Sequence, residues 1–96
     1  MALAITLVTS NQTLNTSFDV HFFDASSDNI VFTLDDIALD GEHYIFKRID
    51  ESDSNGVTIQ GFDETQTIDG EQSIQLLVNE SFEIIAFGGK WETLLR

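Results

Sequence analysis

Alternating apolar and polar residues over residues 44–60 give the clearest structural signal in the chain. In the first half, Tyr44 and Phe46 fall on one side of an extended strand and their neighbours on the other, a period of two that a helix does not have. The second half alternates in the same way around Val57. A polar run ending in Asn55-Gly56 separates the halves, and these two residue types tolerate the positive φ angles of a tight turn. The pattern therefore predicts a β-hairpin.

The same period recurs in short runs along the rest of the chain. Further strands are expected at residues 3–8, 18–23, 30–34, 67–69, 73–77, 81–87 and 90–95. Turn residues such as Asp69-Gly70 and Gly88-Gly89 separate these runs, at the spacing of about 8–12 residues that all-β domains show. The sequence therefore predicts an all-β fold, a small antiparallel β-sandwich or jelly-roll-like barrel of eight or nine short strands. Residues 35–41 break the pattern, and we expect a loop there with room for one helical turn.

The length of 96 residues fits one domain. Residues 1–7 are predicted to be an N-terminal arm or the first strand, and residues 8–96 a single β domain. The apolar start has no preceding Lys or Arg and is too short to cross a membrane, so we expect neither a signal peptide nor a membrane span. No internal repeat is evident, and the absence of cysteine excludes a disulfide.

Two segments are too apolar for a sheet that has one solvated face. Residues 84–87 form a continuous apolar run, and residues 22 and 23 are both phenylalanine. A strand that is apolar on both sides is buried on both, and in so small a domain we expect another subunit to cover the second side. Trp91 is a further aromatic anchor of the kind found in cores or interfaces. The residues predicted at an oligomer interface are Phe23, Ile85, Phe87 and Trp91.

Acidic residues dominate the charge of the chain. Four Lys and Arg oppose 17 Asp and Glu, for a formal net charge of −13. Such a surface repels the phosphates of nucleic acids and anionic lipids, so we expect neither nucleic acid nor a membrane as a partner. It would attract basic protein surfaces or divalent cations, although solubility alone is the simpler explanation.

Residues with metal-binding chemistry do not form a convincing motif. The segment from Glu51 to Gly56 partly imitates a calcium loop, but that loop needs Asp at its first position and Glu at its twelfth, where this chain has Glu51 and Phe62. A second acidic cluster comprises Asp35, Asp36, Asp40 and Glu42. A solvated loop explains it more simply than a cation site does.

Catalytic motifs are also missing. His21 and His43 are the only histidines, and neither lies in a zinc-binding spacing. No Gly-x-Ser-x-Gly elbow is present. Composition alone would allow a catalytic triad or a catalytic pair of carboxylates. Loops this short, however, offer few side chains to line an active-site cleft. We therefore expect no enzymatic activity, no catalytic residues, no bound metal and no cofactor.

From about Val8 to its end, the chain resembles a recurring β-structured module of tailed-bacteriophage virion proteins. The matching stretches are residues 22–34, with Asp24-Ala25-Ser26-Ser27; residues 41–59, with Tyr44-Ile45-Phe46-Lys47-Arg48-Ile49-Asp50; residues 64–70, with Thr67-Ile68-Asp69-Gly70; and Phe87-Gly88-Gly89-Lys90-Trp91. They occur in the order and spacing of the family. One departure is Asp35, where the family has proline after the third strand.

The resemblance implies a non-catalytic structural role. The module occurs in head and tail fibres and capsid-associated proteins, often in trimers. A free-standing β domain fits a capsid decoration (cement) protein, which forms homotrimers on the outer capsid surface of the virion and stabilises contacts between capsomers. Its partner would be the major capsid protein. The predicted capsid contact is the arm, through Ala2, Leu3, Ile5 and Leu7, by strand addition or by packing into a groove.

Two other readings stay open. Within virions, the chain is alternatively a small tail, neck or fibre component. From another class, it is alternatively a calcium- or glycan-binding β module. If residues 2–7 form a capsid-binding arm, their deletion is expected to abolish attachment and leave the fold intact; if they form the first strand, the deletion unfolds the domain.

Overall fold

The computed structural model describes residues 2–95, and these form nine β-strands and no helix. The strands are β1 (Ile5–Val8), β2 (Gln12–Thr13), β3 (Val20–Phe23), β4 (Ile30–Thr33), β5 (His43–Arg48), β6 (Val57–Gln60), β7 (Ser73–Gln75), β8 (Ser81–Phe87) and β9 (Lys90–Leu94). The all-β prediction and the number of strands are confirmed. No helical turn forms over residues 35–41, which remain a loop.

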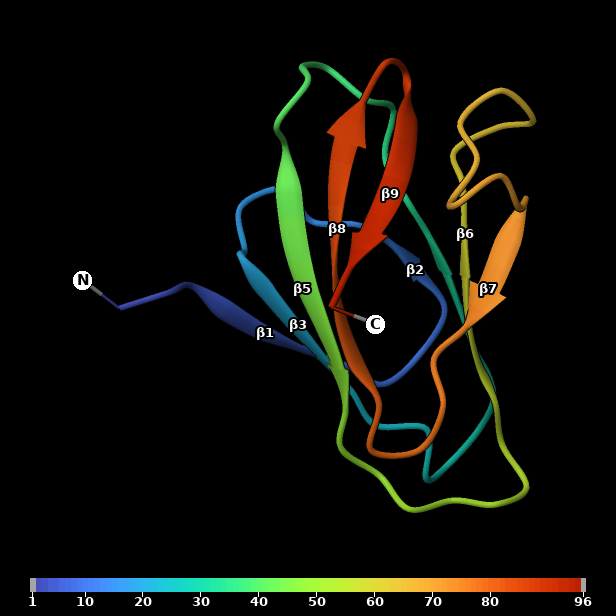
Figure 1. Ribbon diagram of the computed structural model, residues 1–96. Helices are drawn as coiled ribbons and strands as arrows, with labels where there is room; N and C mark the ends of the chain where they lie inside the picture. The colour runs from blue at the N-terminus through green and yellow to red at the C-terminus, as the bar shows by residue number, and fades with distance from the viewer. Residues whose placement is uncertain (1, 96) are drawn as a thin grey trace.

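Two sheets pack face to face, as a small β-sandwich and not as a closed barrel (Figure 1). One sheet has five strands in the order β1-β3-β5-β8-β9, and the other has four in the order β2-β4-β6-β7. The prediction of antiparallel sheets was wrong in this respect, because both sheets are mixed. The pairs β1–β3, β3–β5, β2–β4 and β4–β6 are parallel, whereas β5–β8, β8–β9 and β6–β7 are antiparallel.

The parallel pairs arise because the chain changes sheet after every strand from β1 to β6. Each passage through both sheets makes one coil, and three coils stack in register: Ile5 lies beside Val20, and Val20 lies beside Ile45. Asn11 and Asn29 repeat between coils, since each accepts a hydrogen bond from a backbone amide of the next coil, at Val31 and Gly56 respectively, both at 2.7 Å. This structural repeat was missed in the sequence, because loops of unequal length conceal it.

The predicted hairpin over residues 44–60 was wrong. β5 and β6 lie in different sheets, so residues 49–56 form an arch that crosses from one layer to the other. Neither Asn55 nor Gly56 has the positive φ that a two-residue hairpin turn requires. Two other predicted turns do have this geometry. Asp69-Gly70 has φ of 52° and 84°, and Gly88-Gly89, which joins β8 to β9, has φ of 63° and 80°.

The core lies between the sheets and centres on three phenylalanines. Phe23 and Phe46 come from neighbouring strands of one sheet and Phe32 from the other, and all three are fully buried. Their ring centroids are 5.0–5.6 Å apart in edge-to-face arrangements, the geometry that aromatic rings prefer. The inward positions predicted for Ile30, Phe32 and Leu34 are confirmed.

Gly61, the residue after β6, has no room for a side chain. A Cβ atom there would lie 2.0 Å from the carbonyl oxygen of Gln66. Because that oxygen belongs to the backbone of a folded-back loop, it cannot move aside cheaply. Gly56 differs, since a Cβ atom at that position would meet nothing closer than 3.6 Å.

We therefore expect Gly61→Ala to lower the free energy of unfolding by about 2 kcal/mol or more through overpacking. Gly56→Ala is the matched control and is expected to stay within about 0.5 kcal/mol of the original protein. Urea unfolding followed by Trp91 fluorescence measures both. Equal midpoints for the two variants would show that the loop after Gly61 is not held as described.

Candidate functional site

A buried ion pair fastens the arch between β5 and β6. Arg48 donates from Nε and Nη2 to the two carboxylate oxygens of Asp50, both at 3.0 Å. Asp50 also accepts hydrogen bonds from the backbone amides of Ala25, at 2.9 Å, and Ser52, at 3.1 Å. The guanidinium further donates to the carbonyl oxygens of Asn55 and, on the way to β8, of Leu76. The pair thus ties together three separate connections of the chain.

These contacts exclude Asp50 from ion binding and stabilise its charged form. The hydrogen bonds from Arg48, helped by the Ala25 and Ser52 amides, lower the pKa of Asp50 from 3.8 to about 2. Because the folded-state pKa lies below the unfolded one, this stabilisation is fully present above pH 3.8 and is lost as the pH falls toward 2. The calcium-like segment from Glu51 to Gly56 is therefore part of an internally bonded arch.

The remaining acidic groups do not converge on a common point. Within residues 2–95, no group of three or more His, Asp or Glu side chains is placed to hold a metal ion. In the cluster predicted around Asp35, the carboxylates accept hydrogen bonds from the loop itself or from neighbouring segments. Asp40 accepts from the Gly88 amide, and Glu42 accepts from the Ala38 amide, both at 3.0 Å.

The two histidines lie on opposite sides of the five-stranded sheet. His43 is exposed, with Nε2 4.0 Å from a carboxylate oxygen of Glu83. His21 is fully buried among the rings of Phe32, Tyr44 and Phe46, and neither of its ring nitrogens has a hydrogen-bond partner among the described residues. A triad needs a carboxylate and a hydroxyl on the same imidazole, and His21 has neither.

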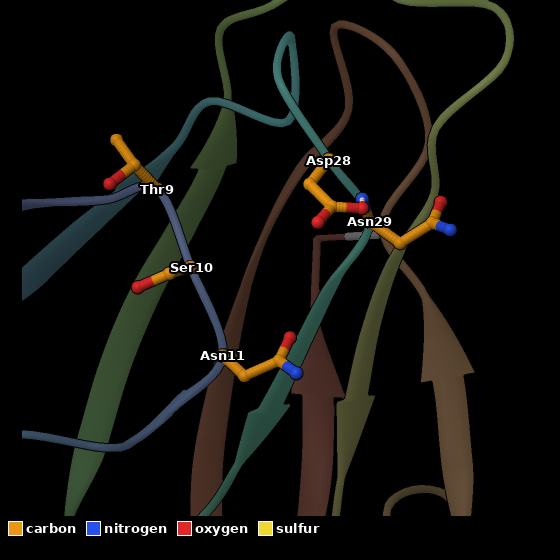
Figure 2. A pocket seen from close by; sticks show the side chains of 5 residues that line it. All are labelled: Thr9, Ser10, Asn11, Asp28 and Asn29. Atoms are coloured by element: carbon orange, nitrogen blue, oxygen red, sulfur yellow. Dashed lines mark hydrogen bonds between the residues drawn. The ribbon is translucent and has the colours of Figure 1, made fainter.

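A shallow polar pocket of about 370 Å³ opens at one end of the sandwich (Figure 2). It is lined by Thr9, Ser10 and Asn11 from the first arch and by Asp28 and Asn29 from the second. The amide oxygens of both asparagines are already used between coils. The five lining residues include no aromatic ring on which a sugar could stack, which leaves the pocket a weak candidate for glycan binding.

The outer faces of the two sheets differ in chemistry. The four-stranded sheet turns uncharged polar side chains outward, and these bond to each other: Gln60 to Thr33 and Gln75 to Thr58, both at 3.0 Å. The five-stranded sheet turns apolar side chains outward, and we call this surface the outer face. Its apolar residues with exposed area are Ile5, Leu7, Phe22, Ile45, Ile85, Phe87 and Leu94.

The edge of this sheet at β1 is open, whereas the edge at β9 is covered. In β9, the backbone amide of Trp91 donates to the carbonyl oxygen of Thr67, and the carbonyl oxygen of Trp91 accepts from the backbone amide of Asp69. The carbonyl oxygens of Ala4, just before β1, and of Val8, at its end, accept hydrogen bonds from backbone amides on the β3 side. Because alternate residues of a parallel strand bond to opposite sides, the backbone groups of Ile5 and Leu7 face the open edge.

The structure places the predicted capsid-contact residues together at this edge. Ala2 and Leu3 are exposed just before β1, and Ile5 and Leu7 in β1 are 57% and 53% exposed. The segment leading into β1 extends away from the body of the fold (Figure 1). Of the predicted segment 1–7, residues 5–7 belong to the first strand and residues 2–4 lie just before it. Residue 1 lies outside the described part of the chain.

The predicted oligomer interface needs a correction. Ile85 and Phe87 lie on the outer face, and Phe87 is 71% exposed. Phe23 and Trp91 are at most 1% exposed and point into the core, so their side chains cannot contact another subunit. Side chains alternate between the two sides of a strand, and Phe23 in β3 and Trp91 in β9 fall on the side that faces the core. Ile45 and Leu94 were missed, although each alternates with inward residues of its strand.

No protein-family model, curated protein or solved structure matches the chain. In addition, no helix of residues 2–95 has the length and apolarity to span a membrane. What the chain does must therefore be inferred from the geometry of its own residues.

Removing Asp50 is expected to destabilise the fold strongly. Asp50→Ala leaves Arg48 buried without its carboxylate partner, which costs about 3–5 kcal/mol. The double variant Arg48→Met/Asp50→Ala removes the unpaired charge as well and should lose less than the sum of the two single variants. Glu51→Ala, an exposed neighbour, serves as the control. Urea unfolding at pH 7 checks this, and strictly additive losses would contradict a coupled pair.

Acid is expected to weaken the fold through His21. Burial lowers the pKa of His21 below 6.5, so below pH 6.5 the unfolded chain binds a proton that the folded chain does not. The stabilisation is complete above pH 6.5 and falls by up to about 1.4 kcal/mol between pH 7.5 and 5.5. We expect His21→Phe to lose this part of the pH dependence and the exposed-site control His43→Gln to keep it, as measured by urea unfolding at both pH values. An unchanged profile in His21→Phe would contradict the assignment.

Proposed function

We propose that the chain is a structural virion protein, a capsid decoration protein that forms homotrimers on the outer surface of a phage head and stabilises the contacts between capsomers. The observation that carries the proposal is the uncovered, uncharged β1 edge in an otherwise strongly acidic protein. Proteins normally protect such an edge with charge, proline or a covering segment. An edge left open with exposed apolar side chains is suited to binding another protein.

Three features support an assembly role. The first charged residue of the chain is Asp19, so the whole first coil offers no charge to oppose docking. Fifteen of the 17 acidic residues lie outside the strands, in the arches and turns, where they would be attracted to basic patches of a capsid. The described residues include no converging catalytic or metal-binding group, which favours a non-enzymatic role.

The resemblance to phage virion modules agrees with this role in a specific way. Among the residues that carry the resemblance, Arg48, Asp50 and Asn55 form hydrogen bonds that hold the arch. Asp69 and Trp91 join the Asp69-Gly70 turn to β9 through a backbone hydrogen bond. These residues maintain a fold and not an active site. In such an assembly, the apolar area at the contacts would contribute about 25 cal/mol per Å² buried, before the entropy of association is subtracted.

The simplest test of the proposal is whether substitutions in β1 weaken the attachment of the protein to phage heads. We expect Ile5→Lys/Leu7→Lys to weaken binding to heads that lack the protein by at least about 10-fold, because lysine on an edge strand blocks strand addition and removes apolar contact. The control is Leu39→Lys/Leu77→Lys, which changes two apolar side chains, 72% and 60% exposed, in loops elsewhere. Both variants should melt within a few degrees of the original protein.

The measurement is co-sedimentation with purified heads, quantified from the pellet. Substitution is preferable to deleting residues 2–7, since the deletion would remove most of a strand that pairs with β3. Undiminished binding of the β1 variant would refute the capsid contact. Binding to tails and not to heads would transfer the protein to the alternative role of a tail, neck or fibre component.

A further inference from the structure

The outer face of the five-stranded sheet carries a different charge balance from the rest of the molecule. Its charged side chains are Lys47, Lys90, Glu83 and Glu92, with the exposed His43 beside Glu83. The formal charge of these groups is zero when histidine is neutral. They include both lysines of the chain: Lys90 is exposed, and Lys47 is half-buried, with its Nζ donating to the carbonyl oxygen of Asn79 at 2.8 Å. Arg48 is buried. Elsewhere on the described surface, the charged residues are acidic.

This balance determines which partner the outer face can accept. A second copy carries the same charge of −13, and its acidic arches would repel those of the first. Two copies can approach closely only where the local charge is neutral or self-complementary. The outer face is such a surface, with two residues of each sign among exposed apolar side chains. A basic partner would instead be drawn to the acidic arches.

The outer face also offers the broader of the two sheet surfaces. Five strands spaced by about 4.8 Å make a face about 24 Å across. The four-stranded sheet offers no comparable surface, because its outward polar groups bond to one another. Opposite charges set among apolar side chains, such as Glu83 between Ile45 and Leu94, favour one docking orientation over others.

We infer that copies of this chain associate through the outer face, with Ile45, Ile85 and Leu94 in apolar contact and Lys47 and Lys90 of one copy paired with Glu83 and Glu92 of another. This identifies the contact between copies that the proposed homotrimer needs, and in that sense it rests on the proposed function. Although Ile5 and Leu7 also lie on the outer face, this contact uses Ile45, Ile85 and Leu94 in the other strands, which leaves Ile5, Leu7 and the backbone edge of β1 for the capsid. In this interface, Ile45 and Leu94 take the place of the predicted residues Phe23 and Trp91, which are buried in the core.

Analytical ultracentrifugation of the purified full chain tests the apolar part of the contact. The original protein should self-associate at micromolar concentration. We expect Ile85→Glu to raise the dissociation constant at least about 10-fold. Val31→Glu is the matched control, because it places the same charge on an apolar residue of the opposite outer face, 38% exposed, and should leave association unchanged.

Charge reversal tests the pairing itself. We expect Lys47→Glu/Lys90→Glu and Glu83→Lys/Glu92→Lys each to associate at least about 10-fold more weakly than the original protein, and a mixture of the two to associate more tightly than either alone. A mixture no tighter than its components would refute the pairing. A monomer at 100 µM, about a hundred-fold above the expected range, would overturn the inference.

The outcomes separate this inference from the proposed function. If the original protein is monomeric and Ile85→Glu fails to bind heads, the outer face contacts the capsid, and the inference fails while the capsid role stands. If copies associate as described but none binds heads, the inference stands and the capsid role fails.

Discussion

The buried pair of Arg48 and Asp50 is the interaction on which the other features of this fold depend. It fixes the arch that carries the chain from β5 in one sheet to β6 in the other. The same two side chains hold Ala25 in the preceding arch and Leu76 on the way to β8. Without this pair, the arch of residues 49–56 would lose the main contacts that hold it across the end of the sandwich. With it, the strands of successive coils stack in parallel, and the three phenylalanines meet between the sheets.

Stacking coils in this way separates charge from the sheets. Residues in strands face either the core or one of two broad outer faces, and only Glu83 and Glu92 among the acidic residues lie in strands. The acidic charge is therefore concentrated in the connections at the two ends. What remains are two surfaces that can contact another protein without strong repulsion: the open edge at β1 and the outer face of the five-stranded sheet. One suits a capsid partner and the other a second copy of the chain.

The sequence was sufficient for local structure and insufficient for the way in which strands pair. Alternation located the strands, and glycine after Asp69 and at positions 88 and 89 located the tight turns, because these are properties of neighbouring residues. The hairpin prediction failed at Asn55-Gly56, since what bends the chain there is a set of contacts with Ala25 and Leu76 that lie far away in sequence. Parallel pairing was not predictable either, as it follows from the stacking of coils of unequal length.

The candidate site shows the same division. The apolar run without charge at the start of the chain is visible in the sequence and was predicted to contact the capsid; the structure leaves its side chains exposed, and the contact itself stays a prediction. Phe23 was assigned to the wrong side of its strand because both sides of β3 are apolar, so that a period of two cannot decide which side faces the core. The covering of one edge by Thr67 and Asp69, which leaves β1 as the open edge, depends on contacts between distant segments and could not be predicted.

The most direct test of the structural role is the number of copies in each purified virion, measured by quantitative mass spectrometry against the major capsid protein. A decoration protein predicts hundreds of copies in a fixed ratio to capsomers. A few copies, in multiples of three or six, would contradict decoration of the head and place the protein at the tail, neck or vertices. Its absence from the particle would contradict a virion role altogether.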